Sequence, residues 1–377
     1  MPFDLNVFCR VLWLGTLGGE RFHWKRAFAT IVGCGIVAAL ALARTIGWGM
    51  DLLIFPRLKK QKVESPIFII GTPRSGTTLL HRLISECHPN AVTTPLWQTL
   101  FPSLTQQRII RGVDTFDRVC LKGWFRRYLV KFENALFRGW EGIHSTGFEA
   151  IEECEAVWLL AMSSPAIYLL VPYIDKLPEI QFLDHESGRR KQTLTKYYRG
   201  FLQRQMYGTR RGQFYLGKNV FFLGRLAALM EEFPDARFVH VVRDPAQSIP
   251  SSVSMFTKPW NIHSPDLVHD KKHYRQMAEI FCHDDRHLVD IYDQFPGRIL
   301  TVQYHDLIQS PRDVVCDISE KLGIGISPDS IPSLERQDKE QQHYTSKHRY
   351  SLEEFGLDSD WLDQQVAEFR RRFNLQG

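Results

Sequence analysis

The residues best suited to hold an anion lie in an eight-residue loop, GTPRSGTT, at positions 71–78. Gly71 and Gly76 let backbone N–H groups approach phosphate oxygens, because no side chain stands in the way. The loop opens a predicted helix, whose N-terminus adds unpaired N–H groups and the positive end of a dipole. Arg74 supplies a fixed charge, and Thr77 and Thr78 supply hydroxyl donors. This phosphate loop therefore predicts a phosphate or sulfate site.

The spacing of the phosphate loop matches that of nucleotide triphosphatases, in which a lysine follows the last glycine. Here Thr77 takes the position of that lysine, and no aspartate ends an apolar strand to hold magnesium. A kinase or ATPase is therefore the second hypothesis rather than the first. A glycine turn without any ligand is the structural alternative for this segment.

A second anion-binding pattern follows about 170 residues later. The run RFVHVV at positions 237–242 ends in Arg243, and Ser251 lies eight residues further on. An arginine at a strand end and a serine on the following helix would make a two-point clamp, because arginine binds phosphate bidentately. The alternative is a structural ion pair between Arg243 and Asp244.

Together, the two patterns resemble those of the PAPS-dependent sulfotransferases (PAPS is 3′-phosphoadenosine 5′-phosphosulfate). The segment PIFIIGTPRSGTTLLHRL is most similar to the bacterial-type branch of that family. The resemblance covers residues 64–375 and implies transfer of a sulfuryl group from PAPS to a hydroxyl, or secondly an amine, by in-line displacement that releases adenosine 3′,5′-bisphosphate. It implies that Arg243 and Ser251 bind the 3′-phosphate, with no metal required. It implies a 5′-phosphosulfate cradle made of Arg74, Ser75, Gly76, Thr77 and Thr78.

Two weaker matches extend the implied cofactor site. The segment VQYHDL resembles the family's Tyr-x-Asp-Leu segment, which would bring Tyr304 near the adenosine; a capped strand end is the alternative. The segment KHRYSLEEFG resembles a C-terminal box of the bacterial-type branch, in which Lys347 and Arg349 would reach the 3′-phosphate. A solvated basic turn explains those two residues nearly as well.

The resemblance implies one catalytic cation, and the proton acceptor stays open. Lys218, in YLGKN, matches the family lysine that neutralises the leaving oxygen. Val220 and Phe222 stand where the family usually has proline and histidine. The position after Trp97 is glutamine instead of glutamate.

The remaining candidates for the general base are a histidine and the acidic run EAIEECE. His144 could accept a proton near neutral pH. Glu153 or Glu152 could do so if burial raised its pKa. A solvated helix face is the alternative for both glutamates. The missing acidic and basic positions motivate a third hypothesis, a catalytically inactive, nucleotide-binding membrane protein.

The elements that position these residues read as alternating strands and helices. Apolar runs at 66–70, 237–242 and 299–304 predict buried strands, and residues 78–86, 226–233 and 313–322 have helical spacing. This alternation predicts an α/β fold, a P-loop-like three-layer arrangement with a central parallel sheet flanked by helices. We expect residues 64–377 to form one catalytic domain.

Residues 1–63 form a separate apolar helical segment in this prediction. Residues 27–43 carry no charge, and residues 46–55 carry only Asp51. A short membrane span and an in-plane hairpin both fit this length, and a buried Ala-rich helix is the alternative. Arg57, Lys59, Lys60 and Lys62 follow, which favours a cytoplasmic catalytic domain. The predicted acceptor is accordingly a small molecule, a lipid or a glycan.

Bulk composition excludes other classes. The net charge of +5 over 377 residues suits an anionic ligand but is too small to indicate nucleic-acid binding. The seven cysteines are scattered singly, without a C-x-x-C pair, so neither a zinc site nor a disulfide framework is predicted.

Overall fold

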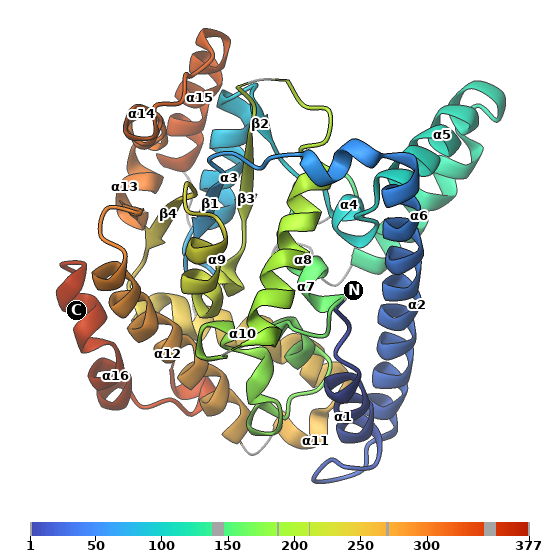
Figure 1. Cartoon of the computed structure of the whole chain (residues 1–377). Coiled ribbons are helices and arrows are strands. Elements are labelled where there is room, and N and C mark those ends of the chain that lie inside the picture. Colours follow the sequence, from blue (N-terminus) through green and yellow to red (C-terminus); the bar gives the residue numbers. More distant parts are fainter. Residues whose placement is uncertain are drawn as a thin grey trace.

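Five parallel strands form the centre of the molecule in the computed structural model (Figure 1), which describes residues 2–137, 147–186, 188–210, 212–268, 271–342 and 352–375. The strand order is β2-β3-β1-β4-β5. β1 lies in the middle and pairs with β3 on one side and β4 on the other. The strands are β1 (Ile67–Ile70), β2 (Ala91–Val92), β3 (Phe214–Lys218), β4 (Arg237–Val242) and β5 (Ile299–Gln303).

The strands alternate their side chains between two helical layers. Ile67 and Ile69 point to a cluster with α3, α14 and α15, while Phe68 and Ile70 point to a cluster with α7, α8, α9, α12 and α16. Because both faces are covered, β1 is apolar throughout and entirely buried. The predicted three-layer α/β fold with a parallel sheet is confirmed. The predicted strands near 66, 237 and 299 are all present.

The helices that contribute to these layers or to the outer shell have the following bounds: α1 Leu5–Thr16, α2 Trp24–Ile54, α3 Thr77–Cys87, α4 Leu96–Leu100, α5 Leu104–Cys120, α6 Trp124–Phe137, α7 Glu155–Leu159, α8 Arg189–Gln205, α9 Leu226–Glu232, α10 Pro245–His263, α11 Pro265–Val268, α12 Lys272–Gln294, α13 Tyr304–Gln309, α14 Pro311–Leu322, α15 Ile331–Gln342 and α16 Ser359–Arg372. Short 3-10 helices include η1 (Pro56–Lys60) and η7 (Val220–Arg225).

The N-terminal apolar segment is one continuous helix, α2, which runs along one side of the molecule (Figure 1). The predicted in-plane hairpin is therefore wrong: the glycines within α2 are tolerated and do not break it. Among the described residues, α2 alone is long and apolar enough to cross a membrane, with a mean hydropathy of 2.0 in its most apolar window.

The N-terminal helices also pack into the hydrophobic clusters of the rest of the chain. Val7 and Val11 of α1 and Cys34 of α2 join a cluster with residues of α10 and α12, and Trp48 joins the cluster around Phe68. The domain boundary near residue 63 stays a prediction. It falls between η1 and β1.

Candidate active site

The phosphate loop connects β1 to the N-terminus of α3, and its shape depends on glycine at two positions. Gly76 precedes the helix with φ of 91°, and a Cβ there would lie 2.9 Å from the ring of Tyr304. A Cβ on Gly71 would lie 2.7 Å from the Ser75 hydroxyl and 2.8 Å from the Val241 carbonyl. Larger residues would therefore displace the loop, the neighbouring strand or the tyrosine. The loop keeps this tight turn around the start of α3.

The interior of the loop presents an unsatisfied polar atom. The Ser75 hydroxyl is fully buried and finds no hydrogen-bond partner among the described residues. A buried hydroxyl without a partner costs about 1–3 kcal/mol. Arg74 occupies a left-handed conformation with φ of 67°, which strains a non-glycine residue. Both features fit a loop shaped to receive an anion.

The predicted second clamp meets the phosphate loop in space. The Arg74 Nε donates a hydrogen bond to the Ser251 hydroxyl at 3.2 Å, although 177 positions separate them. The Arg243 guanidinium donates to the Arg74 carbonyl at 2.6 Å and lies 4.3 Å from the centre of the Tyr304 ring. Ser252 donates to the carbonyl of Pro73 at 3.0 Å. The first half of α10 and the residue after β4 therefore contact the loop directly and stabilise its position.

The alternative interpretation of the clamp, an Arg243–Asp244 ion pair, is wrong. The Asp244 carboxylate pairs with Arg370 of α16 at 3.0 Å and accepts the N–H of Ala246 at the start of α10. Among the described residues, Arg243 contacts the loop, the Tyr304 ring and the Gln247 side chain.

Lys218 reaches the same place from the neighbouring strand. It ends β3, opposite Ile69 of β1, so parallel pairing brings its side chain to the edge where the loop begins. Its Nζ donates to the Thr78 hydroxyl at 2.9 Å and pairs with Glu153 at 2.9 Å. Only 1% of Lys218 is exposed. The surface-lysine alternative is therefore wrong, because this ammonium is buried against the loop and a carboxylate.

Two glutamates lie beside that ammonium, in the segment before α7. Glu153 keeps 18% of its side chain exposed and pairs with Lys218, so it is not the solvated helix face of the alternative interpretation. Burial raises the pKa of Glu152 to about 7; Lys218 opposes the shift and Glu153 adds to it. A carboxyl that titrates near neutral pH is suited to proton transfer. The site thus combines a buried cation with a carboxyl tuned toward neutrality.

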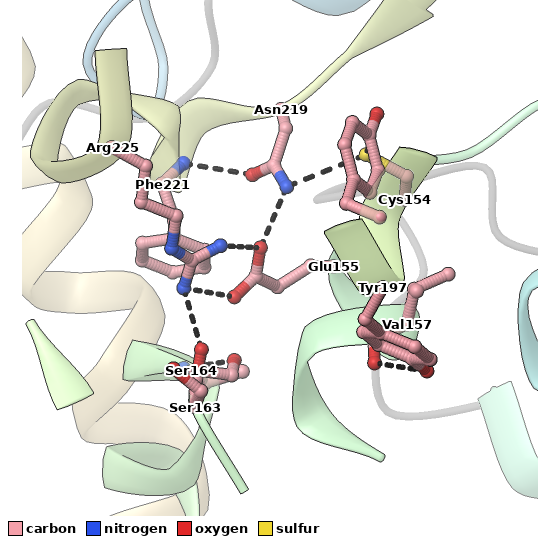
Figure 2. Close-up of polar contacts among 11 residues, drawn as sticks. Cys154, Glu155, Val157, Ser163, Ser164, Tyr197, Asn219, Phe221 and Arg225 are labelled. Atoms are coloured by element: carbon pink, nitrogen blue, oxygen red, sulfur yellow. Dashed lines mark hydrogen bonds and ion pairs between the residues drawn. The ribbon is translucent and has the colours of Figure 1, made fainter. Parts of the chain in front are cut away.

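A buried polar network fixes this acidic segment to the end of β3 (Figure 2). Glu155 accepts two hydrogen bonds from Arg225, at 3.0 and 3.1 Å, and one from the Asn219 amide at 2.6 Å. Arg225 also donates to the Ser163 carbonyl at 2.9 Å. Because Asn219 directly follows Lys218, the network holds both partners of the Lys218–Glu153 pair. No local sequence pattern indicates this network, because its members are up to 70 residues apart.

Three predicted residues, His144, Lys347 and Arg349, lie outside the described residues. Tyr304 lies at the start of α13, against Gly76 and Arg243. Phe222, where the family usually has histidine, is fully buried in the apolar cluster around Phe68. Within the described ranges, no three His, Cys, Asp or Glu side chains form a group that could hold a metal ion.

Comparison with known proteins assigns this arrangement to a family. A sequence model described as "Sulfotransferase family" matches residues 66–328, from the residue before β1 to Pro328, which follows α14. The chain belongs to the sulfotransferase family. The match includes the phosphate loop, Lys218 and the clamp, and it supports sulfuryl transfer rather than the kinase, ATPase or inactive alternatives.

Curated relatives agree with the family. This sulfotransferase is 28% identical over 327 residues to "Omega-hydroxy-beta-dihydromenaquinone-9 sulfotransferase Stf3" of Mycobacterium bovis, and equally to the protein of that name from Mycobacterium tuberculosis. The alignment covers 82% of this chain and 76% of each relative. The family implies PAPS as the sulfuryl donor.

Solved structures agree in fold. Sulfotransferase STF9 from Mycobacterium avium superposes with a TM-score of 0.73 at 16% identity, covering 100% of this chain and 98% of its own. Sulfotransferase STF1 from Mycobacterium tuberculosis H37Rv gives 0.71 at 18% identity, covering 97% and 92%. The likeness includes the helices before β1, since the whole of this chain is covered.

Proposed function

We propose that this sulfotransferase holds PAPS through the phosphate loop and the Arg243–Ser251 clamp and transfers its sulfuryl group to a hydroxyl. The observation that carries the proposal is the meeting of Arg74, Arg243 and Ser251 at the N-terminus of α3, around the unsatisfied hydroxyl of Ser75. Backbone N–H groups, a helix dipole and two guanidinium groups favour a dianionic ligand there. In this proposal the loop holds the 5′-phosphosulfate, with Ser75, Gly76, Thr77 and Thr78 lining it.

The clamp is assigned to the 3′-phosphate, which distinguishes PAPS from ATP. The Arg243 guanidinium and the Ser251 hydroxyl both touch the backbone or side chain of Arg74, so both lie at one rim of the loop. The ring of Tyr304, stacked against Arg243, offers an aromatic surface for the adenosine. Arg349 remains a further candidate for the 3′-phosphate.

Lys218 is assigned to the leaving oxygen. Sulfuryl transfer, like phosphoryl transfer, calls mainly for alignment and for stabilisation of charge on the departing group. The ammonium of Lys218 is buried and aimed at Thr78, so it needs little reorganisation to meet that charge. Its partner Glu153 keeps the ammonium oriented.

Glu152 is the general base that the electrostatics favour. Its raised pKa lets it accept the acceptor's proton near pH 7, whereas Glu153 is engaged by Lys218. His144 is the other candidate, and the variants described in the Discussion separate the two. The proton moves from the acceptor hydroxyl to the base as the oxygen attacks sulfur, so no charge accumulates on the acceptor.

For the acceptor we propose the hydroxyl of a hydrophobic, lipid-like molecule. The Mycobacterium tuberculosis and Mycobacterium bovis relatives carry a hydroxylated dihydromenaquinone in their names. The apolar helix α2 supports membrane association, where such an acceptor would dissolve. The basic residues of η1 directly after α2 favour a catalytic domain on the cytoplasmic side.

Calorimetry with adenosine 3′,5′-bisphosphate tests the donor site. We expect binding by the wild-type protein and a loss of about 10- to 100-fold in affinity for Arg243→Ala, because a charge-assisted hydrogen bond contributes about 1.5–3 kcal/mol. The control is Arg199→Ala. Arg199 pairs with Glu232, which lies just before the N-terminal end of β4, whereas the phosphate loop lies at the C-terminal ends of the strands. Equal binding of ADP, which lacks the 3′-phosphate, together with an unaffected Arg243→Ala variant, would contradict the proposal.

Turnover with labelled PAPS tests the acceptor class. The panel compares long-chain and isoprenoid alcohols with simple phenols and with sugars. We expect sulfation of the hydrophobic alcohols in detergent. Turnover restricted to sugars would refute the proposed acceptor, and an absence of turnover with every acceptor would favour the inactive nucleotide-binding protein.

A further inference from the structure

Three of the four charged residues of α2 face inward, whereas an ordinary surface helix turns its charged residues toward solvent; the fourth, Lys25, is exposed. Arg26, Arg44 and Asp51 are each no more than 1% exposed. Arg26 pairs with Asp266, and Asp51 pairs with Arg204 at 2.8 Å. These contacts lie near the two ends of the helix.

Arg44 adds a third anchor in the second half of the helix. It donates to the carbonyls of Leu160 and Pro2 and to the hydroxyl of Tyr197, at 2.9–3.0 Å. A spanning helix would have to give up all three sets of contacts. It would also carry Arg44 and Asp51 into hydrocarbon, which is costly. The anchors therefore hold α2 along the side of the molecule.

The outer stripe of α2, the side opposite the anchors, is uncharged from position 28 to position 53. The 25 steps of 1.5 Å between these two positions make it about 38 Å long. Its large side chains are 55–83% exposed at most positions, so more than half of each faces solvent. They include Phe28, Ile31, Ile36, Leu42, Ile46 and Leu53.

A second exposed surface, the α5–α6 arm (residues 104–137), starts at the C-terminal end of α2. The Asp51 carboxylate accepts hydrogen bonds from Ser103, Leu104 and Thr105 at the beginning of α5, which joins the two surfaces. In Figure 1 the arm projects outward beside α2. The two surfaces therefore meet on the same side of the molecule.

Apolar and basic residues alternate over the arm. Every described side chain of α6 from position 124 to 135 is exposed except that of Glu133. The arm carries seven Lys or Arg against three Asp or Glu. One of the three, Asp117, is buried and caps α6. The exposed apolar side chains of the α5–α6 arm include Phe116, Val119, Trp124, Phe125, Leu129 and Phe132.

We propose that the outer stripe of α2 and the α5–α6 arm form one membrane-docking surface, which lies in the plane of an anionic phospholipid bilayer without crossing it. The inference rests on the proposed membrane association and names the surface and its mode. Aromatic and basic residues mixed along exposed helices match the interface of a bilayer, where rings enter the headgroup region and Lys and Arg meet lipid phosphates. The basic residues of η1 extend this charge at the end of α2 next to the arm.

The docking surface is connected to the catalytic segment. Glu133 of α6 accepts the N–H of Phe148 at 2.6 Å, and the strand-like bridge between Pro95 and Ile151 follows. Glu152 and Glu153 come next in the chain. A lipid acceptor held in the bilayer at the arm would therefore approach the site from the side that carries the proposed base.

Vesicle co-sedimentation of the full-length protein tests the surface. We expect binding to phosphatidylcholine vesicles that contain phosphatidylglycerol and weak binding to phosphatidylcholine alone. The double variants Phe125→Glu with Phe132→Glu, and Ile36→Glu with Leu42→Glu, should each lower vesicle binding at least about tenfold, because they place charge where apolar area is buried. The matched control is Ile331→Glu, an exposed isoleucine on α15, far from α2 in Figure 1.

Charge reversal gives a second, milder test. Replacing Arg127 and Lys131 with glutamate should weaken binding to the anionic vesicles about fivefold per removed charge, while leaving the residual binding to neutral vesicles unchanged. Extraction of membranes with alkaline carbonate then separates the modes. We expect release of the protein, and retention in the membrane would overturn in-plane docking.

Unchanged vesicle binding in both apolar double variants would overturn the proposed surface. So would a wild-type dimer that fails to bind vesicles and becomes monomeric in these variants, since a second copy would then be the occupant. Calorimetry with adenosine 3′,5′-bisphosphate on the same samples reports folding and the donor site independently. Vesicle binding without bisphosphate binding would refute the proposed donor site and leave the docking surface intact.

Discussion

Replacement of Lys218 by methionine tests the proposed chemistry most directly. The two side chains have similar lengths, so methionine fills the buried space and removes only the ammonium. That ammonium lies 2.9 Å from both the Thr78 hydroxyl and the Glu153 carboxylate. Glu153, with 18% of its side chain exposed, can turn toward water when its partner is lost. We therefore expect a folded protein with a melting temperature within a few degrees of the wild type.

The magnitude of the catalytic loss follows from the role of a preorganised charge. Removing one group that stabilises developing charge lowers kcat by about 10²- to 10³-fold, or roughly 3–4 kcal/mol. Affinity for adenosine 3′,5′-bisphosphate should fall less, by about 10- to 100-fold, because the leaving oxygen stays on the 5′-phosphate of this product and a charge-assisted hydrogen bond to it contributes about 1.5–3 kcal/mol. The loss should therefore be larger in turnover than in product binding.

The pH profile supplies a second readout, which tests Glu152 as the general base. A base must be deprotonated to act, so wild-type turnover should rise with pH through about 7, the pKa to which burial raises Glu152. Lys218 lowers that pKa, so Lys218→Met should move the rise to higher pH. Glu152→Gln should abolish the rise, whereas Glu153→Gln should retain it.

The assay is initial-rate transfer from labelled PAPS to a long-chain alcohol over a range of pH. Lys321→Met on α14 is the matched control, because Lys321 is exposed and pairs with Asp317 on the surface. A Lys218→Met variant with kcat within about twofold of the wild type would refute the assignment. A normal rise through pH 7 in Glu152→Gln would move the base to another residue, with His144 the remaining candidate.

Three further changes test the scaffold of the site. Glu155→Gln should destabilise the protein by about 3–5 kcal/mol in urea unfolding, because it leaves Arg225 buried without its carboxylate; Glu279→Gln, in an exposed pair, should cost less than about 0.5 kcal/mol. Gly76→Ala should weaken adenosine 3′,5′-bisphosphate binding about tenfold or more by calorimetry, since its Cβ would collide with Tyr304 at a φ that alanine disfavours; unchanged affinity would show that the loop relaxes freely. Asp51→Asn should lower the unfolding free energy by about 3 kcal/mol, because Arg204 loses its buried charged partner and the first N–H groups of α5 lose a carboxylate acceptor; a loss below about 1 kcal/mol would show that α2 is not anchored there.

Local sequence patterns were sufficient to predict the strands whose apolar runs are longest. The run RFVHVV became β4 at the expected positions, and the glycine-rich loop became the turn into α3. Both patterns depend on contiguous residues, since apolar runs form buried strands and only glycine suits the tight turn. The strand β3 was missed, although its residues FYLGK are apolar or aromatic up to Gly217 and entirely buried. It is only five residues long and ends in the polar Lys218, so its apolar run is too short to predict a strand.

Side-chain partners could not be read from the sequence in the same way. The spacing of Arg243 and Ser251 indicated a clamp, but not that both contact Arg74. The Asp244–Arg370 pair joins residues 126 positions apart and removes the ion pair that adjacency suggested. Such contacts depend on which segments the sheet brings together. Sequence spacing does not determine that.

Contiguous residues were enough to predict a phosphate-binding loop at the start of a helix in an α/β protein, followed by a second basic pattern. They also showed that the chain carries a long apolar segment near its start. The position of Lys218 beside Thr78, with the acidic segment fixed next to it, depends on contacts between distant segments of the fold. The same holds for the orientation of α2, which turns Arg44 and Asp51 inward and its apolar side outward. The charged side chains of a helix are buried where other segments supply carboxylates, guanidinium groups or carbonyls to pair with them. Those segments are distant in the sequence, so the buried face cannot be read from the helix alone.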